Sequence, residues 1–284
     1  MSAPFALEPW AAPHRARVDA WMRGRLAAAE PSAFAEALLW PVAAGGKRYR
    51  PLLCFAAAEA VGASPDDPLV LAAAGAVELV HTYSLVHDDL PCMDDDDERR
   101  GLPTVHKKWS EGVAVLVGDA LLTEAFGALA EAGAPARALP LVVRLAQASG
   151  HRGMVGGQAW DIGLGGPITD GAGLLRLHRG KTGALIEAAV WMGAAAGGAD
   201  AAALAAAARA GAALGVAFQI ADDVLDADED AGDGGPPSYV KLYGVGGARA
   251  RAEALLAEAD AALAGLAAPG ALAALARYTL DRSV

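Results

Sequence analysis

Aspartates clustered directly after an apolar run are the residues of this sequence best suited to chemistry. Residues 75–86 are largely apolar and helix-compatible, and they lead into Asp88 and Asp89. Pro91 ends or kinks that helix, and four further aspartates follow at positions 94–97. Carboxylates at the end of a buried helix lose hydration and repel one another unless a cation neutralises them. Hard oxygen ligands beside substrate phosphates are the set that Mg²⁺ prefers.

A second acidic cluster follows another apolar run far downstream. Asp222, Asp223 and Asp226 come directly after the apolar residues 201–221. Asp222 and Asp226 are four residues apart and therefore share one face of a helix. Two carboxylate sets that face each other can hold a diphosphate through bridging metal ions. The sequence therefore predicts one cavity with an acidic cluster on each side.

Two other interpretations of these clusters compete with a metal site. One acidic run alone fits a solvated helix end about as well. An EF-hand loop is excluded by spacing, because the Asp-x-Asp-x-Asp-Gly alternation and its closing Glu are missing. Two clusters that each close an apolar helix favour the metal site over simple solvation.

Basic residues beside glycines form a second kind of candidate site. Two glycines precede Lys47 and Arg50, so the backbone can approach a phosphate whose oxygens the guanidinium matches. A solvated loop between helices is the alternative for this segment. Lys181 and Thr182 interrupt a helical pattern, which fits either a kink with an extended lysine or a phosphate contact.

Composition predicts an all-α fold and argues against nucleic-acid binding. The 284 residues are 54% hydrophobic, alanine dominates, and β-branched residues are sparse, which favours helices around a large core. The net charge of −11 leaves no basic face for nucleic acid. We expect residues 1–284 to form a single domain.

The sequence predicts a cytoplasmic protein without a membrane span. Two cysteines, Cys54 and Cys92, give no disulfide framework, which fits a reducing compartment. Residues 1–7 lack the basic start and apolar core of a signal peptide. Residues 201–221 are apolar with Arg209 as their only charge, but they consist mostly of alanine and glycine and lead into aspartates. A buried core helix is therefore favoured over a membrane span.

Apolar periodicity and helix breakers predict the elements that must position these residues. Helices are expected over residues 52–61, 66–86, 113–132, 137–149, 174–192, 201–225, 248–266 and 271–280, after an amphipathic helix that ends by residue 30. Ser32 is expected to cap the next helix, and Asp119 is expected to be buried. Residues 153–158 are small enough to let helices pack closely, and residues 228–237 form the one clear loop.

Several fragments in a fixed order resemble the trans-prenyl diphosphate synthases, the polyprenyl synthetase family. Asp88, Asp89 and Asp94 are similar to the family's first aspartate-rich motif in its bacterial form, which has two extra residues, and residues 222–226 match the second motif. Shorter matches are residues 46–51, His81, and residues 99–101, 118–119, 157–158 and 181–182. The similarity to bacterial farnesyl diphosphate synthases implies an isoprenoid-synthase-type helical bundle around a deep central cavity, usually as a homodimer.

The resemblance implies a role for each matched residue. Isopentenyl diphosphate would be held by Lys47, Arg50, His81 and Arg100, and the allylic diphosphate by Arg99, Lys181, Thr182 and Gln219. Mg²⁺, as three ions with substrate bound, would be held by Asp88, Asp89 and Asp94 on one side and by Asp222, Asp223 and Asp226 on the other. The residues expected to act in catalysis are Asp88, Asp89, Lys181, Thr182, Gln219 and Asp222.

The implied reaction is a head-to-tail prenyl transfer to farnesyl diphosphate. Metals and bases neutralise the allylic diphosphate, its C–O bond breaks, and the isopentenyl double bond attacks the allylic cation before a proton is lost. An apolar cavity must exclude water from that cation. Tyr83 lies about 7.5 Å along the helix from Asp88 and, with small Ser84 beside it, is expected to limit chain length. Ordinary core packing of Tyr83 is the alternative.

One departure from the family pattern concerns the loop after the second cluster. The family carries lysines there, whereas residues 228–238 are shorter and place Pro236 where the second lysine would stand, with Lys241 as the base nearby. We expect slower ionisation or weaker allylic affinity as a result. Alternative functions are a geranylgeranyl diphosphate synthase, a class I terpene synthase, and a low-activity or regulatory homologue. The basic set around Lys47 argues against the terpene synthase, which needs no second diphosphate site.

Overall fold

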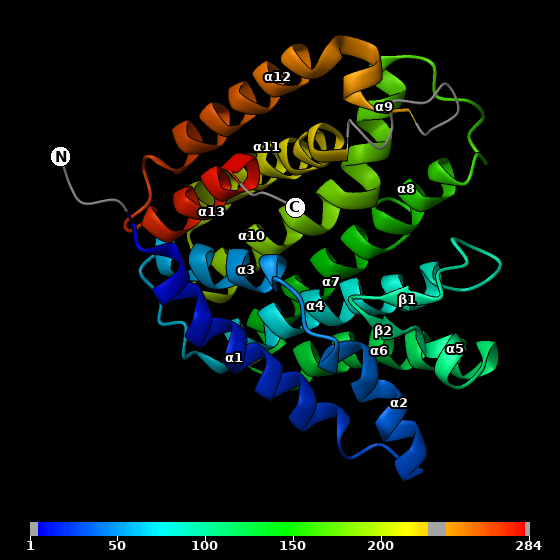
Figure 1. The fold of residues 1–284 in the computed structure, drawn as a ribbon. Coiled ribbons are helices and arrows are strands. Elements are labelled where there is room, and N and C mark those ends of the chain that lie inside the picture. The colour runs from blue at the N-terminus through cyan, green and yellow to red at the C-terminus, as the bar shows by residue number, and fades with distance from the viewer. Residues whose placement is uncertain (1–4, 134, 227–236, 282–284) are drawn as a thin grey trace.

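Helices supply almost all regular structure in the parts of the chain that this computed structural model describes, residues 5–133, 135–226 and 237–281 (Figure 1). The α-helices are α1 (Leu7–Leu26), α2 (Ser32–Ala43), α3 (Tyr49–Ala60), α4 (Pro68–Asp88), α5 (Val105–Lys108), α6 (Glu111–Glu131), α7 (Pro135–Ser149), α8 (Met154–Asp161), α9 (Gly171–His178), α10 (Ala184–Ala196), α11 (Ala201–Leu225), α12 (Tyr239–Leu263) and α13 (Gly270–Asp281). A π-helical segment, η1 (Arg179–Gly183), joins α9 to α10. One short hairpin pairs β1 (Glu98–Arg99) with β2 (Leu102–Pro103). The predicted all-α fold is confirmed.

The two helices that carry the acidic clusters begin at aspartate caps. Asp67 accepts a hydrogen bond from the Leu69 amide at 2.8 Å at the start of α4, and Asp200 accepts one from the Ala203 amide at 2.8 Å at the start of α11. Such caps satisfy amides that have no partner inside the helix. α4 ends at Asp88, shortly before Pro91, as the sequence predicts.

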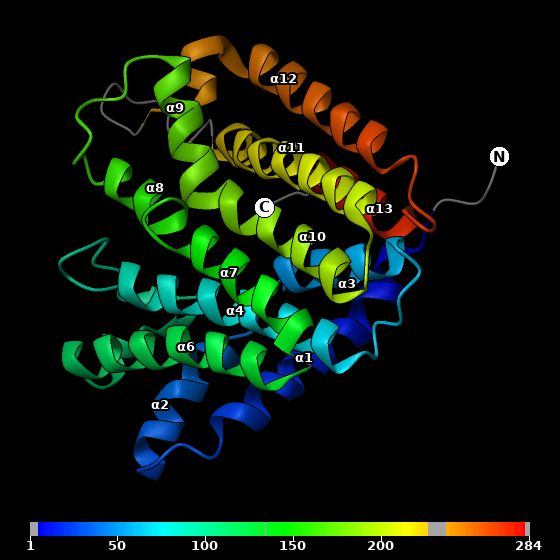
Figure 2. The same ribbon diagram turned by 180° about the vertical axis from the view of Figure 1, so that it is seen from behind.

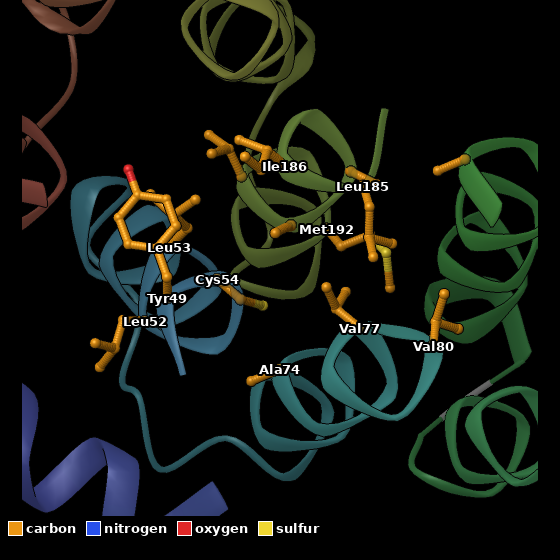
Figure 3. Packing of buried hydrophobic residues seen from close by; sticks show 14 of the residues in the cluster. Tyr49, Leu52, Leu53, Cys54, Ala74, Val77, Val80, Leu185, Ile186 and Met192 are labelled. Carbon is orange, nitrogen blue, oxygen red and sulfur yellow. The ribbon is translucent and has the colours of Figure 1, made fainter. Parts of the chain in front are cut away.

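Helix α10 lies at the centre of the molecule, where it packs against α3, α4, α7 and α11 (Figures 1 and 2). Leu185, Ile186 and Met192 of α10 lie in one core with buried side chains of α3 and α4 (Figure 3). A Cβ at Gly193 would lie only 2.0 Å from the Cys54 carbonyl oxygen. Glycine therefore allows α10 to approach α3 closely, and many small residues let the neighbouring helices do the same.

The predicted interruption at Lys181 and Thr182 is a π-helical turn. Such a turn inserts one residue into the helix and changes where the following side chains point. The small residues of α8 lie against it, because a Cβ at Gly157 would meet the Lys181 amide nitrogen at 2.0 Å. The close packing predicted for residues 153–158 is therefore confirmed.

A buried ion pair that the sequence analysis did not predict holds the segment before α3. Arg48 is 2% exposed and has a left-handed φ of 50°. Its guanidinium contacts Glu78 at 3.0 Å and Asp19 at 2.7 Å, and it donates to the carbonyl oxygens of Val42 and Gly45 at 2.7 and 2.8 Å. The pair therefore fixes the glycine-containing turn on which Lys47 lies.

Several local predictions were wrong. Asp119 is exposed rather than buried, because the face of α6 that carries it, together with Val115 and Leu116, points to solvent in the single chain. Ser32 is the first residue of α2 and not its cap; Pro31 precedes the helix, and no side chain caps it. α12 starts at Tyr239 rather than residue 248, because the chain continues as helix across a kink at Gly244.

The predicted loop at residues 228–237, which includes Pro236, lies almost wholly outside the described residues.

Within the described part of the chain, three helices are long and apolar enough to cross a membrane by length and composition: α4, α6 and α11. Protein covers 78% of the apolar window of α4, 50% of that of α11 and 39% of that of α6. The folded chain thus buries most of the α4 window, and α11 forms part of the core as predicted.

Breaking the Arg48–Glu78 pair is expected to destabilise the fold strongly. Arg48→Met and Glu78→Leu should each lower the free energy of unfolding by about 3 kcal/mol. The first leaves buried Glu78 without its ion-pair partner, and the second removes one of the two carboxylates that hold buried Arg48. The double variant should lose less than the sum by about 1 kcal/mol or more. Urea denaturation measures all three. Arg277→Met, which breaks an exposed pair with Asp260, is the control and should cost less than about 1 kcal/mol; strictly additive losses would contradict the account.

Candidate active site

The first acidic cluster forms where α4 ends and the chain turns back. The Asp94 amide donates to the Asp88 carbonyl oxygen at 2.8 Å, so the turn returns Asp94 to the helix end. Gln158 of α8 donates to the Asp88 carboxylate at 3.1 Å. Burial raises the pKa of Asp88 to about 6; Lys181 opposes that rise, and Asp94 adds to it. This carboxylate therefore lies among both like charges and a base, at a position where a cation would be stabilised.

Asp89 is paired with Arg99 of the hairpin. The Arg99 guanidinium donates to Asp89 at 2.6 Å and contacts Asp96 at 3.0 Å. Asp89 is 4% exposed, and its burial raises the pKa of the carboxyl group while Arg99 opposes the rise. Together with Arg100, these two residues line a separate small cavity. The hairpin thus brings one base onto the acidic helix end.

The second acidic cluster is tied to the π-helical turn and to α12. The Thr182 hydroxyl donates to Gln219 Oε1 at 2.7 Å, and Gln219 Nε2 donates to Asp223 at 3.5 Å. The other oxygen of Asp223 accepts from the Tyr239 amide at 2.7 Å. Asp223 is therefore occupied by protein groups, whereas Asp222 is half-buried one residue earlier.

The aspartates at the outer ends of the two clusters lie in open positions. Asp94 is exposed after the α4 turn, and Asp226 is exposed at the end of α11, where its amide donates to the Asp222 carbonyl oxygen. Neither residue lines the cavities described below. Asp89 and Asp223 are thus the most buried members of their clusters and face protein partners, whereas Asp88 and Asp222 are half-buried.

All four residues predicted to hold isopentenyl diphosphate line one cavity of about 450 Å³. Lys47, Arg50, His81 and Arg100 are all in its wall. Arg100 also donates to the Gly45 carbonyl oxygen. A Cβ at Gly46 would meet the Arg100 guanidinium at 2.6 Å, and its φ of +134° also favours glycine. The glycines therefore bring the backbone and the arginine into contact, as expected for an anion site.

Burial shapes the charge state of this basic cavity. Burial lowers the pKa of Arg50, and Glu78 and Asp222 oppose that effect. Arg50 Nε is buried without a hydrogen-bond partner among the described residues. Burial, with Arg50 and Arg100 nearby, holds the pKa of His81 well below its usual range. A neutral His81 can donate one hydrogen bond to an anion without adding charge.

A second, more apolar cavity of about 480 Å³ adjoins the basic one, because Arg50 and His81 line both. Asp88, Gln158, Lys181 and Thr182 supply its polar wall, and its other lining residues are Tyr83, Ser84, Leu85, His87, Met93, Met154, Val155, Ala159 and Ile162. Tyr83 is 6% exposed and packs edge-on against His87 with ring centroids 5.8 Å apart. Burial raises the pKa of the Tyr83 hydroxyl.

The two acidic clusters reach this pair of cavities through shared neighbours. Asp222 affects the pKa of Arg50, which lines the same cavity as Asp88. Lys181 affects the pKa of Asp88, while its neighbour Thr182 bonds Gln219 on the helix of Asp222. The acidic ends of α4 and α11 are therefore linked through Arg50 and through two residues of η1, Lys181 and Thr182.

The sequence analysis gave no role to several groups that support the site. Asp161 pairs with Lys181, and His178 Nε2 lies 3.9 Å from Asp223. Burial lowers the pKa of His178 to about 4. Only Glu78 gave a usable signal, because it is an acid inside an apolar helical run and so requires a buried partner.

Comparisons with known proteins agree with this geometry. Residues 31–238 match the sequence model of the family described as polyprenyl synthetase. The chain is 42% identical over 274 residues to geranylgeranyl pyrophosphate synthase 11, chloroplastic, of Arabidopsis thaliana, covering 89% of this chain and 76% of that protein. It is 50% identical over 158 residues to farnesyl diphosphate synthase of Escherichia coli (strain K12), covering 54% of this chain and 52% of that protein. The chain thus spans about half the length of several curated relatives that it matches.

Solved structures match over nearly the whole chain. The FPP/GFPP synthase of Zymomonas mobilis in its apo structure has a TM-score of 0.88 at 36% identity, over 96% of this chain and 98% of that one. A putative farnesyl-diphosphate synthase of Marinomonas sp. MED121 has a TM-score of 0.86 at 36% identity, over 98% of this chain and 100% of that one. The predicted isoprenoid-synthase-type helical fold is confirmed, and the chain belongs to the polyprenyl synthetase family of prenyltransferases.

Proposed function

We propose that this chain is a Mg²⁺-dependent enzyme that condenses isopentenyl diphosphate with dimethylallyl or geranyl diphosphate to give farnesyl diphosphate. The observation that carries the proposal is a pair of adjoining cavities, because Arg50 and His81 line both. One cavity is basic. The other is largely apolar, with acidic and basic residues such as Asp88 and Lys181 in its wall. Two diphosphates can be held there side by side, with one hydrocarbon tail directed into the apolar cavity.

In this proposal the basic cavity holds isopentenyl diphosphate. Lys47, Arg50 and Arg100 supply positive charge, and His81 supplies a neutral donor. The Arg50 Nε that has no partner in the described chain is a donor suited to a diphosphate oxygen. The isopentenyl double bond then lies near the boundary between the two cavities, where the allylic carbon would be presented.

The allylic diphosphate is assigned to Lys181 and Thr182 in the wall of the apolar cavity and to Arg99 and Gln219, which do not line it. Arg99, Lys181, Thr182 and Gln219 orient its oxygens. The carboxylates of Asp88, Asp89, Asp94, Asp222 and Asp226 would hold Mg²⁺, as three ions with substrate bound. When bound, Mg²⁺ supplies the positive charge that the departing diphosphate needs.

The donor set fits such an ion. The first cluster offers oxygen ligands. Asp88 is half-buried beside other acids, and its own pKa is raised to about 6, so a bound cation would relieve the repulsion. Asp223 was predicted as a ligand. Its bonds to Gln219 and the Tyr239 amide favour a role in positioning Gln219 and the start of α12.

The chain's own residues would then guide the reaction. Lys181 and Arg99 stabilise the leaving diphosphate as the C–O bond breaks. The apolar wall excludes water from the allylic cation while the isopentenyl double bond attacks it. The departing diphosphate, held by Lys181 and Thr182, is the base assigned to accept the proton. Tyr83 limits the space for the growing tail.

Geranylgeranyl diphosphate is a second candidate product. The relative with the longest match by sequence in the comparisons given above is a geranylgeranyl pyrophosphate synthase. The buried ring of Tyr83 five residues before Asp88 supports the shorter farnesyl product. A class I terpene synthase is disfavoured by the basic cavity, which has no use in a reaction with one diphosphate.

The assembly state, domain organisation and compartment are part of the same proposal. Exposed Val115 and Leu116 on α6, with Leu139 and Val143 on α7, support a homodimer. One continuous apolar core that includes residues from α1 to α13 supports a single domain over residues 1–284. The free cysteines Cys54 and Cys92 support a reducing cytoplasm.

Isopentenyl incorporation tests the proposed reaction directly. With Mg²⁺ and an allylic diphosphate, the chain should incorporate radiolabelled isopentenyl diphosphate into a longer prenyl diphosphate, and EDTA should abolish it. Lys47→Gln should raise the KM for isopentenyl diphosphate about 10–100-fold, because it removes a charge-assisted contact, and leave the allylic KM unchanged. Lys241→Gln is the matched control. If the allylic diphosphate is consumed but no radiolabelled isopentenyl diphosphate is incorporated, the chain is a terpene synthase. If neither substrate is consumed, the chain is a non-catalytic homologue.

Shortening Tyr83 should lengthen the product. The wild-type chain is expected to give the fifteen-carbon product, and Tyr83→Ala mainly twenty carbons or more, because the ring no longer blocks the apolar cavity. Tyr83→Phe keeps the ring and should keep the product length. Reversed-phase chromatography of the dephosphorylated products measures this. A wild-type product of twenty carbons would favour the geranylgeranyl alternative, and an unchanged Tyr83→Ala product would show that Tyr83 is not the cavity floor.

A further inference from the structure

Three potential metal ligands gather outside the proposed reaction cavities. Ligand atoms of Asp95, Asp97 and His106 lie within 4.8 Å of one another. Asp95 and Asp97 belong to the turn after α4, and His106 belongs to α5 on the far side of the β1–β2 hairpin. None of the three lines the two cavities assigned to substrates. Asp95 and Asp97 belong to the acidic run at positions 94–97, which the proposed function leaves largely unused.

A hydrogen-bond chain leaves His106 with a free nitrogen. The Thr104 hydroxyl donates to the Asp96 carbonyl oxygen at 2.9 Å and contacts His106 Nδ1 at 3.0 Å. With the hydroxyl proton directed to Asp96, Nδ1 is assigned as the protonated nitrogen, which donates to Thr104. His106 Nε2 then carries a lone pair. This nitrogen is buried and has no hydrogen-bond partner among the described residues. The whole residue is likewise buried, with 8% of its surface exposed.

An imidazole lone pair fixed in this way is the arrangement seen at metal sites. A metal-binding histidine commonly donates its other N–H to a neighbouring oxygen, which sets the tautomer and the ring orientation. Here Thr104 is that neighbour. The buried Nε2 therefore points to a ligand independently of the two carboxylates, which by themselves would be an ordinary acidic turn.

A lysine currently supplies the positive charge at this cluster. Lys107 Nζ contacts Asp97 at 2.6 Å, and Asp97 and Asp95 both raise the pKa of Lys107. The pair is at the surface, where such contacts contribute little stability. A divalent ion can displace the ammonium group, because Asp97 keeps a second oxygen and Lys107 can turn into solvent.

We propose that Asp95, Asp97 and His106 bind a transition-metal ion such as Zn²⁺, separately from the Mg²⁺ carboxylates. One imidazole and two carboxylates suit Zn²⁺ better than Mg²⁺, which prefers oxygen ligands alone. Bonds of about 2.0–2.2 Å in a tetrahedron put ligand atoms about 3.4 Å apart. The exposed aspartate side chains can close the remaining gap, and water would complete the shell.

The bound ion would link the turn after α4 to α5. The segment between them carries Arg99 and Arg100, which the proposed function assigns to the two diphosphates. A metal at this position would therefore hold the hairpin that delivers both arginines. The inference does not depend on which product the enzyme makes, and metal binding can be measured without turnover.

Co²⁺ is a suitable spectroscopic probe of the site. The untagged full-length chain, with saturating Mg²⁺ present to fill the acidic clusters, should bind one equivalent of Co²⁺ with the intense visible absorption of a four-coordinate ion. One equivalent of Zn²⁺ should remove the band. His106→Gln and Asp97→Asn should abolish it or weaken binding at least about tenfold. Thr104→Val should weaken binding about 10–100-fold, because it removes the group that orients the imidazole.

Three further variants separate this site from a structural cluster and from the reaction site. Lys107→Met should tighten Co²⁺ binding, because it removes the competing cation. His151→Gln, which changes an exposed histidine, should leave the band unchanged, as should Asp222→Asn. Far-UV circular dichroism confirms that each variant is folded. The proposal is overturned if the band survives in folded His106→Gln, if Asp222→Asn removes it, or if no Co²⁺ binds while Mg²⁺ is present.

Discussion

Negative charge placed at the ends of two apolar helices is the constraint on which the rest of this structure depends. Asp88 closes α4 and Asp222 lies in the last turn of α11, each beside a hydrophobic core. Burial raises the pKa of Asp88 to about 6, so its charged form is held only at a cost in free energy. Bases delivered by other elements offset part of that cost: Arg99 from the hairpin, Lys181 from η1 and Arg50 from α3. A site of this kind is stabilised by cations and by anionic substrates that bring cations with them.

The scaffold that holds these charges consists of helices that pack closely because many of their side chains are small. Small side chains on α10 and α8 allow backbone approaches that larger residues would prevent, as Gly193 against Cys54 and Gly157 against Lys181 illustrate. Close packing gives precise positions to the residues at the helix ends. The same scaffold leaves an apolar cavity beside the charged groups, which is what chemistry through an allylic cation requires.

Much of the fold could be predicted from the sequence because the signals were local. The apolar runs of α4 and α11, the break before Pro91 and the interruption at Lys181 follow from periodicity and known helix breakers. Asp119 could not be placed correctly, because apolar residues on the outer face of α6 make that helix look buried all round. The pattern alone does not separate an exposed apolar face from a core face.

The candidate site was predictable in its residue types and only partly in its geometry. Lys47, Arg50, His81 and Arg100 line one cavity, and Asp88, Tyr83, Lys181 and Thr182 line the next. The link between them at Arg50 depends on tertiary packing that no single sequence window contains. The attachment of Asp223 to the Tyr239 amide was likewise invisible, because the start of α12 lies beyond the loop and backbone partners leave no trace in the sequence. For the buried Arg48–Glu78 pair, the sequence signalled Glu78, an acid in an apolar run, but not its partner.

Anomalous diffraction from crystals grown with Mn²⁺ and a non-hydrolysable allylic diphosphate analogue tests the central claim most directly. The account predicts Mn²⁺ peaks about 2.1 Å from carboxylate oxygens of Asp88 and of Asp222, with both sets of ions on one diphosphate at the mouth of the apolar cavity. Peaks at only one of the two helices, or a diphosphate bound without contact to either aspartate, would contradict it.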